Sequence, residues 1–136
     1  MKTKVFALVL GLITFSTFAQ KNELKTADKA IKIQDYSAAM TAVTAAESLL
    51  SKMDDKSKAK FYFLKAQAYF GKKDYQTAAN TFEKLFNLEN ETGKIRYTEL
   101  ATTIQNQMVQ DVYQKASDQY TAKDYKNASD SFYLTY

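Results

Sequence analysis

Hydrophobic residues between Phe61 and Leu85 recur every three or four positions, which places them on one face of an α-helix. Phe63, Ala66 and Phe70 form this face in the first half of the stretch. Polar residues 72–74 interrupt the pattern, which then resumes in a second set: Tyr75, Ala78, Ala79, Phe82 and Leu85. Both sets contain alanines, which let two helices approach closely, so the stretch predicts an antiparallel helical hairpin.

Turn signals lie between and before the two predicted helices. Gly71 predicts the end of the first helix, since glycine readily takes the left-handed conformation common at helix C-termini. Asp74 predicts the start of the second, because its carboxylate can accept hydrogen bonds from free backbone N–H groups. Asp54 or Asp55 is expected to cap the first helix in the same way. A catalytic carboxylate pair is the alternative there, but adjacent residues at a helix start point in different directions, which favours capping.

Two weaker copies of this pattern flank the central hairpin. Asp35-Tyr36 and Asp124-Tyr125 match Asp74-Tyr75, 39 residues earlier and 50 residues later. The second interval is longer by 11 residues, close to three helical turns, so an insertion of that size keeps the same face inward. The copies predict three units, over about residues 21–52, 55–89 and 94–136, of which the last is incomplete.

The third unit is expected to begin with one helix from about Lys94 to Ala122. A break near Thr102-Thr103 is the alternative, since consecutive β-branched residues are weak helix formers. The chain has no proline and only three glycines, and it is rich in alanine, lysine and glutamine. This composition favours helices and leaves little turn chemistry for sheets, so we expect an all-α fold.

The combination of Ala66, Tyr69, Asp74-Tyr75, Ala78 and Phe82 resembles the tetratricopeptide repeat, a family of helix–turn–helix units of about 34 residues. The chain departs from the family pattern at Tyr62, where tryptophan is usual, and at Asn90, where proline is common. The resemblance implies antiparallel helical hairpins stacked as a short right-handed solenoid. It also implies a concave groove, lined by the first helix of each unit, that binds a peptide or helix of a partner protein.

Superposition of the three units places apolar residues at two matching positions on each first helix, seven residues apart and therefore on one face. By the resemblance, these positions and the polar residues beside them line the groove: Leu24, Asp28, Ile31, Lys32, Phe63, Gln67, Phe70, Tyr113, Ser117 and Tyr120. For Phe63 and Phe70, packing between units is the competing interpretation, because small units need much core. Tyr113 and Tyr120 suit a groove better, since a phenol can keep its hydroxyl in water while its ring makes contact.

Residues 1–19 have the features of a secretory signal peptide: the basic residues Lys2 and Lys4, an apolar run over 5–18, and small residues before a cleavage site after Ala19. The apolar run is too short for a transmembrane span, which needs about 20 residues. The Ala-Gln-Lys junction resembles those of proteins exported by Gram-negative bacteria. We therefore expect a helical repeat domain over residues 20–136 with no membrane span after cleavage. Its expected location is the periplasm or, alternatively, the outer-membrane surface or the medium.

Composition gives little support to catalysis or to nucleic-acid binding. Without Lys2 and Lys4, 17 basic residues face 15 acidic ones, a net charge of +2 that is too small to indicate a nucleic-acid partner. The chain has no histidine and no cysteine, which are the commonest general base, thiolate nucleophile and zinc ligands. We therefore expect no enzymatic activity, no metal site and no cofactor.

These observations favour a non-enzymatic adaptor or scaffold of the bacterial cell envelope that binds another protein or a peptide. One alternative is self-association through the apolar end, Phe132 to Tyr136. Another is that the sequence is the N-terminal fragment of a longer protein, because an uncovered apolar end is an association hazard. The three units would then be the repeat segment of an enzyme whose catalytic domain lies beyond Tyr136.

Overall fold

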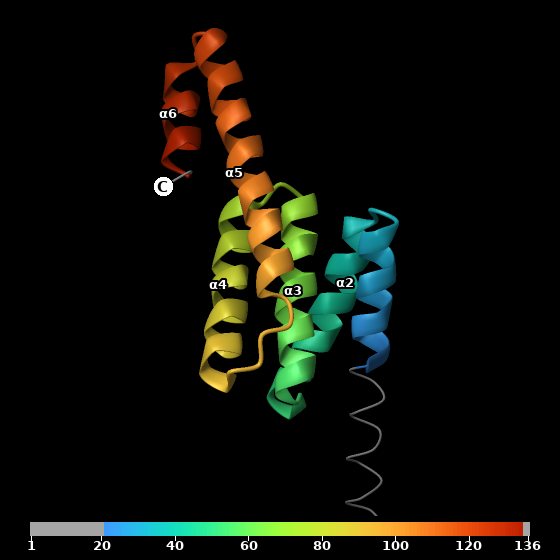
Figure 1. Ribbon diagram of the computed structural model, residues 1–136. Helices are drawn as coiled ribbons and strands as arrows, with labels where there is room; N and C mark the ends of the chain where they lie inside the picture. The colour runs from blue at the N-terminus through green and yellow to red at the C-terminus, as the bar shows by residue number, and fades with distance from the viewer. Residues whose placement is uncertain (1–20, 135–136) are drawn as a thin grey trace, which may run out of the picture.

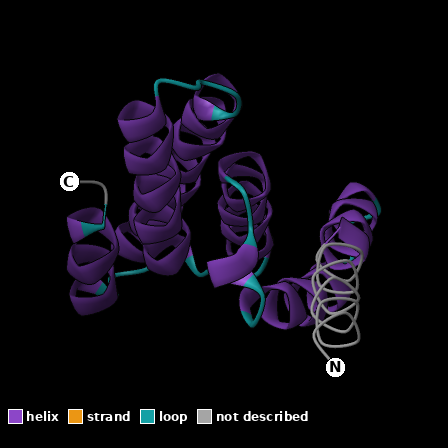
Figure 2. Ribbon diagram, turned by 90° about the horizontal axis from the view of Figure 1, so that it is seen from below, coloured by secondary structure: helices purple, strands orange, loops and turns teal. Residues whose placement is uncertain are grey.

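The computed structural model describes residues 21–134, and every regular element in that range is a helix (Figure 1). A first helix over residues 21–32 is followed by α2 (Tyr36–Glu47), the short 3-10 helix η1 (Leu50–Lys52), α3 (Asp55–Gly71), α4 (Tyr75–Thr92), α5 (Thr98–Thr121) and α6 (Tyr125–Tyr133). The view from below likewise shows only helices and loops in this range, which confirms the all-α prediction (Figure 2). The predicted signal peptide lies outside the described residues.

Three turns of the same construction join the helices in pairs. Asp35, Asp74 and Asp124 each precede a helix, and a carboxylate oxygen of each accepts a hydrogen bond from the backbone N–H three residues later, at 2.9, 3.2 and 3.5 Å. The N-cap prediction for Asp74 is therefore confirmed. These caps define three helical hairpins: the first helix with α2, α3 with α4, and α5 with α6.

The residue before each capping aspartate closes the preceding helix. Gln34, Lys73 and Lys123 have φ values of 60°, 62° and 65°, in the left-handed region. In the central turn, the Lys73 N–H donates to the Phe70 carbonyl at 2.8 Å and the Asp74 N–H donates to the Tyr69 carbonyl at 3.0 Å. This pair of hydrogen bonds is the Schellman motif, which satisfies carbonyls at a helix end. The prediction that the helix ends at Gly71 is confirmed, but the left-handed conformation expected there belongs to Lys73.

Gly71 has a steric role instead. It is the last residue of α3, and the ring of Tyr36, the first residue of α2, lies against it. Any Cβ at position 71 would collide with that ring. The absence of a side chain at Gly71 therefore allows the turn of the first hairpin to pack against the end of α3.

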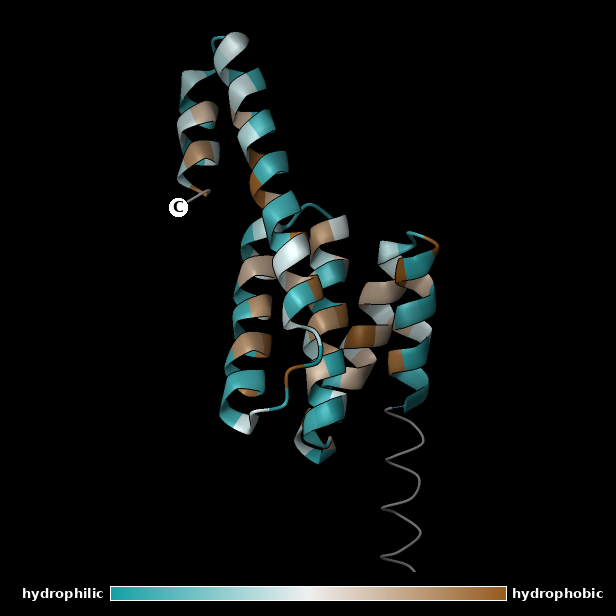
Figure 3. Cartoon of the chain, in the orientation of Figure 1, coloured by the Kyte–Doolittle hydropathy of each residue, from teal (hydrophilic) through white to brown (hydrophobic). Residues whose placement is uncertain are grey.

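α3 is the central helix, because it packs against both of its neighbours. Its Phe61 and Leu64 lie in one cluster with Leu24 of the first helix and Val43 of α2. Its Ala66 lies in a second cluster that draws on α4 and α5: Ala78, Phe82, Leu85, Ala101 and Met108. Phe61 and Phe82 are fully buried, and burial of each contributes about 1.5–3 kcal/mol. Figure 3 shows hydrophobic residues recurring along α3 and α4.

α5 is one unbroken helix of 24 residues, as predicted in preference to a break at Thr102-Thr103. Both threonine hydroxyls donate to carbonyls one turn earlier, those of Thr98 and Glu99, at 2.8 and 3.1 Å. Its predicted start at Lys94 is wrong, since residues 94–97 form a non-helical connection. α5 reaches well past the ends of α3 and α4, and α6 packs along its far part (Figure 1).

Replacement of Gly71 by alanine is expected to destabilise the protein by about 1–3 kcal/mol, because overpacking against Tyr36 outweighs the better helix propensity of alanine. The free energy of unfolding, measured by denaturant titration, checks this. In a Tyr36→Ala background the obstruction is gone, so Gly71→Ala should become neutral or stabilising by up to about 1 kcal/mol.

Gly93→Ala is the matched control. Gly93 has φ 65° and open space around it, so alanine costs about 1–2 kcal/mol through backbone strain alone, whatever residue 36 is. An equal cost of Gly71→Ala in both backgrounds would contradict the steric role.

Candidate interaction surface

The groove residues predicted on the first helix divide into core and surface. Leu24 is only 3% exposed and belongs to the cluster around Phe61, so it serves packing. Ile31 is half-buried at the edge of the same cluster. Asp28 and Lys32 form an ion pair at 2.9 Å across one helical turn, and the lysine side chain is 71% exposed. This helix therefore offers a partner mainly polar surface.

On α3 the predicted groove is covered at its start. Phe63 is half-buried, and its ring stacks on that of Tyr97, with centroids 4.7 Å apart. Tyr97 belongs to the connection between α4 and α5, so this connection occupies the surface that Phe63 would offer to a partner. Further along α3, Gln67 is half-buried and Phe70 lies beside Tyr75, with ring centroids 6.1 Å apart. The Phe63–Tyr97 contact is packing between units, the competing interpretation, whereas the Phe70–Tyr75 contact joins the two helices of one hairpin.

The predicted positions on α5 are the open ones. Tyr113 and Tyr120 are 60% and 61% exposed, and Ser117 lies half-buried between them. Each tyrosine ring makes an edge contact with a ring of α6: Tyr113 with Phe132 at 5.5 Å and Tyr120 with Tyr125 at 5.4 Å. The third hairpin thus carries a row of aromatic side chains that are ordered by one another and accessible to solvent.

Glu89, a residue that the sequence analysis missed, fixes where α5 begins. It is 1% exposed near the end of α4. Its carboxylate accepts hydrogen bonds from the Tyr97 N–H at 2.9 Å, the Thr98 N–H at 3.1 Å and the Thr98 hydroxyl at 2.8 Å. Tyr97, the N-cap residue of α5, makes no side-chain cap, so Glu89 supplies the cap from the preceding helix. Its spacing in the sequence was the signal that could have identified Glu89. This acidic residue lies one helical turn after Leu85, on the buried face that includes Phe82 and Leu85.

The carboxylate of Glu89 is held in its charged form. Burial alone would raise the pKa of Glu89, but hydrogen bonds from the Arg96 N–H and from Thr98 and Tyr97 outweigh it and lower the pKa below its ordinary value. The charge also lies at the N-terminus of α5, where the helix dipole favours an anion. A buried acid here is therefore a satisfied structural group.

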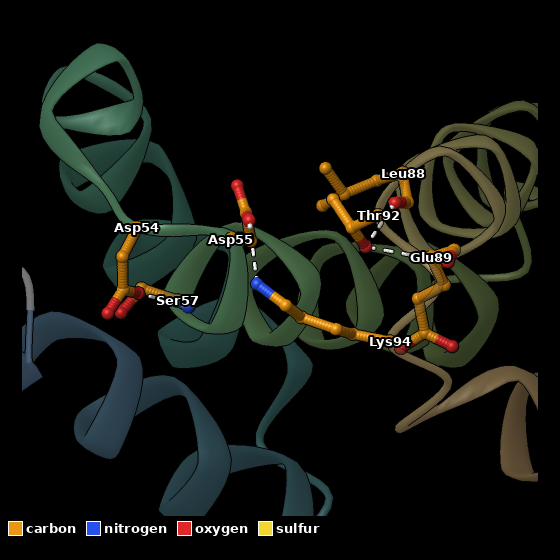
Figure 4. Close-up of polar contacts among 7 residues, drawn as sticks. All are labelled: Asp54, Asp55, Ser57, Leu88, Glu89, Thr92 and Lys94. Carbon is orange, nitrogen blue, oxygen red and sulfur yellow. Dashed lines mark hydrogen bonds and ion pairs between the residues drawn. The ribbon is translucent and has the colours of Figure 1, made fainter.

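An exposed ion pair joins the connection to α3, because Lys94 pairs with Asp55 at 3.4 Å (Figure 4). Just before the connection, the Thr92 hydroxyl donates within α4 to the Leu88 carbonyl at 2.7 Å. Asp54 caps α3 as expected, accepting from the Ser57 N–H at 2.7 Å, and its hydrogen bonds with Ser57 lower the pKa of its carboxyl. Exposed ion pairs such as Lys94–Asp55 contribute only about 0–1 kcal/mol, so the buried Glu89 carries most of the constraint.

A cleft of about 600 Å³ lies where α4, α5 and the end of α6 meet. Its lining is apolar with three side-chain amides and no charged residue: Tyr75, Gln76, Ala79, Gln105, Asn106, Met108, Val109, Val112, Tyr133 and Leu134. Val109 is 48% exposed and Leu134 is 45% exposed. Burial raises the pKa of the Tyr75 phenol, and the Asp111 carboxylate raises it further. Sequence reasoning did not find this cleft, because it depends on how far α6 is displaced along α5.

Residues 21–134 contain no group of three or more acidic, histidine or cysteine side chains placed to hold a metal ion. Among the helices of this range, none is long and apolar enough to span a bilayer. Comparison with protein-family models, curated proteins and solved structures finds no match for the chain.

Replacement of Glu89 by glutamine is expected to destabilise the protein at neutral pH by about 1.5–3 kcal/mol, the worth of hydrogen bonds to a charged group. The pKa of Glu89 is lowered by folding, so its stabilisation is present above the ordinary glutamate value of 4.5 and is lost as pH falls through the folded pKa. The deficit of the variant should therefore shrink in acid. Denaturant titrations across this pH range measure it.

Glu91→Gln provides the control, because Glu91 is exposed on the same helix. It should change the free energy of unfolding by no more than about 0.5 kcal/mol at any pH. A Glu89→Gln deficit that stays constant as the pH falls would rule out the charged cap.

Proposed function

We propose that the chain is a non-enzymatic protein–protein interaction module of the bacterial cell envelope, with hairpins arranged as a short right-handed solenoid of the tetratricopeptide type. The three matching Asp-Tyr turns support a repeated hairpin architecture. The exported location rests on the features of residues 1–19.

The concentration of exposed apolar surface on the third hairpin carries this proposal. Seven of the nine large hydrophobic residues exposed in the described part of the chain belong to α5, α6 or the residue that follows: Leu100, Val109, Tyr113, Tyr120, Tyr125, Tyr133 and Leu134. Clustered exposed hydrophobic residues mark interaction sites more often than scattered ones do. Tyrosine is also enriched in the energetically important positions of protein interfaces.

The partner-binding surface that we propose is the Tyr113–Ser117–Tyr120 face of α5. The earlier part of the expected groove is filled by Tyr97, which covers Phe63. Tyr113 and Tyr120 are two helical turns apart and held by rings of α6, so a partner meets a preorganised pair. Each ring contributes about 1.5–3 kcal/mol by burial before association costs, which suits a micromolar site.

Self-association is the second candidate, because the end of α6 leaves Tyr133 80% exposed and Leu134 45% exposed. A second copy covering these residues would remove apolar surface from water. Sedimentation across a concentration series decides this candidate, since a monomer at all concentrations eliminates it.

Photo-crosslinking tests the proposed surface. A benzophenone amino acid placed at Tyr113 or Tyr120, in the protein expressed in its own cells, should give one adduct of defined mass, which mass spectrometry identifies. The double substitution Tyr113→Ala and Tyr120→Ala should weaken the purified complex by about tenfold or more. Each substitution removes a ring that binding of the partner would bury.

Ile33 is the control position, because it is 76% exposed but lies in the turn of the first hairpin. The same probe at Ile33 should not give the adduct. Identical adducts from positions 33, 113 and 120, or none from the two α5 positions, would count against the proposed surface.

A further inference from the structure

The ring of Tyr97 lies on the first two hairpins, although the residue belongs to the connection that leads into the third. This connection joins α4 to α5 beside α3 (Figure 1). The Tyr97 ring stacks on that of Phe63 in α3, with centroids 4.7 Å apart and an interplanar angle of 20°. Burial raises the pKa of this phenol, and the carboxylates of Asp28 and Glu89 raise it further, against the charge of Arg96. Since Asp28 belongs to the first helix, the ring reaches from α3 toward that helix.

The surface under the Tyr97 ring is held in place by other contacts. Phe63 is half-buried, and its ring also contacts the fully buried ring of Phe82, with centroids 6.5 Å apart. α3 itself packs against the first hairpin on one side and against α4 on the other. The Phe63 ring would therefore keep its position if the ring of Tyr97 moved away.

The backbone of Tyr97 is fixed independently of its side chain. Its N–H donates to the Glu89 carboxylate at 2.9 Å, and its carbonyl accepts from the Ala101 N–H at 2.8 Å. The Tyr97 hydroxyl, in contrast, forms no hydrogen bond with another described residue, and the side chain is only half-buried. A change of rotamer about the Cα–Cβ bond would therefore lift the ring from Phe63 and leave both backbone hydrogen bonds intact.

We propose that Phe63 and Asp28 form a binding site for a tyrosine side chain of a partner protein, and that Tyr97 occupies this site until the partner displaces it. The occupant shows the chemistry of the ligand. A flat ring stacks on Phe63, and its hydroxyl lies close enough to Asp28 to be influenced by that charge. The Asp28 carboxylate already accepts a hydrogen bond from Lys32 and has room for a second one, from the hydroxyl of the ligand.

The contact between Tyr97 and Phe63 is thus autoinhibitory. A ligand can bind only those molecules whose Tyr97 ring has moved away, so its apparent affinity is reduced by the fraction of molecules in that state. Removal of the ring should abolish this reduction. The site is separate from the proposed surface on α5, and the inference therefore goes beyond the proposed function.

N-acetyltyrosinamide is the probe, because it carries the proposed side chain on a minimal peptide unit. It should bind the Tyr97→Ala variant with a millimolar dissociation constant and shift the NMR signals of the Phe63 ring. The wild-type protein should bind it at least about tenfold more weakly. N-acetylphenylalaninamide, which lacks the hydroxyl, should bind Tyr97→Ala at least about threefold more weakly than the tyrosine amide does.

Tyr120→Ala is the matched control, because Tyr120 is also a tyrosine whose ring contacts another ring, but it is 61% exposed and lies on α5 far from Phe63. It should leave the affinity for the tyrosine amide within about twofold of the wild-type value. Phe63→Leu in the Tyr97→Ala background removes the ring under the ligand and should weaken binding about fivefold or more. Circular dichroism and thermal unfolding check that each variant folds.

A second measurement keeps residue 97 aromatic and so does not depend on the folding of Tyr97→Ala. A fluorotyrosine at position 97 reports the position of the ring by fluorine NMR. As N-acetyltyrosinamide saturates the protein, this signal should move toward that of a solvent-exposed tyrosine. The shift would show displacement of the ring by the ligand.

Three results would overturn the proposal: equal affinity of the wild type and Tyr97→Ala, no saturable binding to either, or a fluorine signal that stays unchanged at saturation. Equal binding of the two amides would overturn the assignment of tyrosine as the ligand. Failure of the proposed function is read separately, from crosslinking at Tyr113 and Tyr120.

Discussion

The hydrogen bonds between the Glu89 carboxylate and the start of α5 set the course of the second half of the molecule. Without them, the backbone N–H groups of residues 97 and 98 would need other acceptors, and α5 would have no fixed origin. With them, α5 begins beside the end of α4, and Tyr97 is held over Phe63. One buried charge therefore determines both where the third hairpin starts and which part of the expected groove is covered.

The three hairpins have the same kind of turn but differ in what the tyrosine of that turn contacts. The difference arises from the length of the helix that follows in the next hairpin. Tyr36 packs on Gly71, at the end of the next hairpin's first helix. The corresponding Tyr75 does not meet the end of α5, because α5 is longer; it lies in the cleft instead, near Asp111. The same residue type in the same turn thus contributes to packing in one place and lines an accessible cavity in the other.

Local sequence signals predicted the elements well. The recurrence of apolar residues every three or four positions and the capping aspartates specify helices through short-range contacts, and the cap at Asp74 and the continuous α5 followed from them. The role of Glu89 and the non-helical state of residues 94–97 could not be predicted in this way. Their structure depends on a contact between α4 and α5 that spacing alone does not reveal. Gly71 was misread for the same reason: its neighbour Tyr36 is 35 positions away in the chain. Of the candidate site, Tyr113 and Tyr120 lie at the surface as expected, whereas Leu24 lies in the core.

The length of α5 determines where the turn of the third hairpin lies. The additional 11 residues predicted as one insertion are divided between α4 and α5, and α5 itself exceeds α3 by seven residues, with 24 against 17. Seven residues are close to two helical turns, so they carry the last turn about 10 Å further along the helix axis and keep its buried face nearly in register. α5 thus holds α6 and the turn at Asp124 beyond the ends of α3 and α4 (Figure 1). Because whole helical turns can be added or removed without rotating that hairpin, its reach is a property that evolution or design can adjust independently of the core.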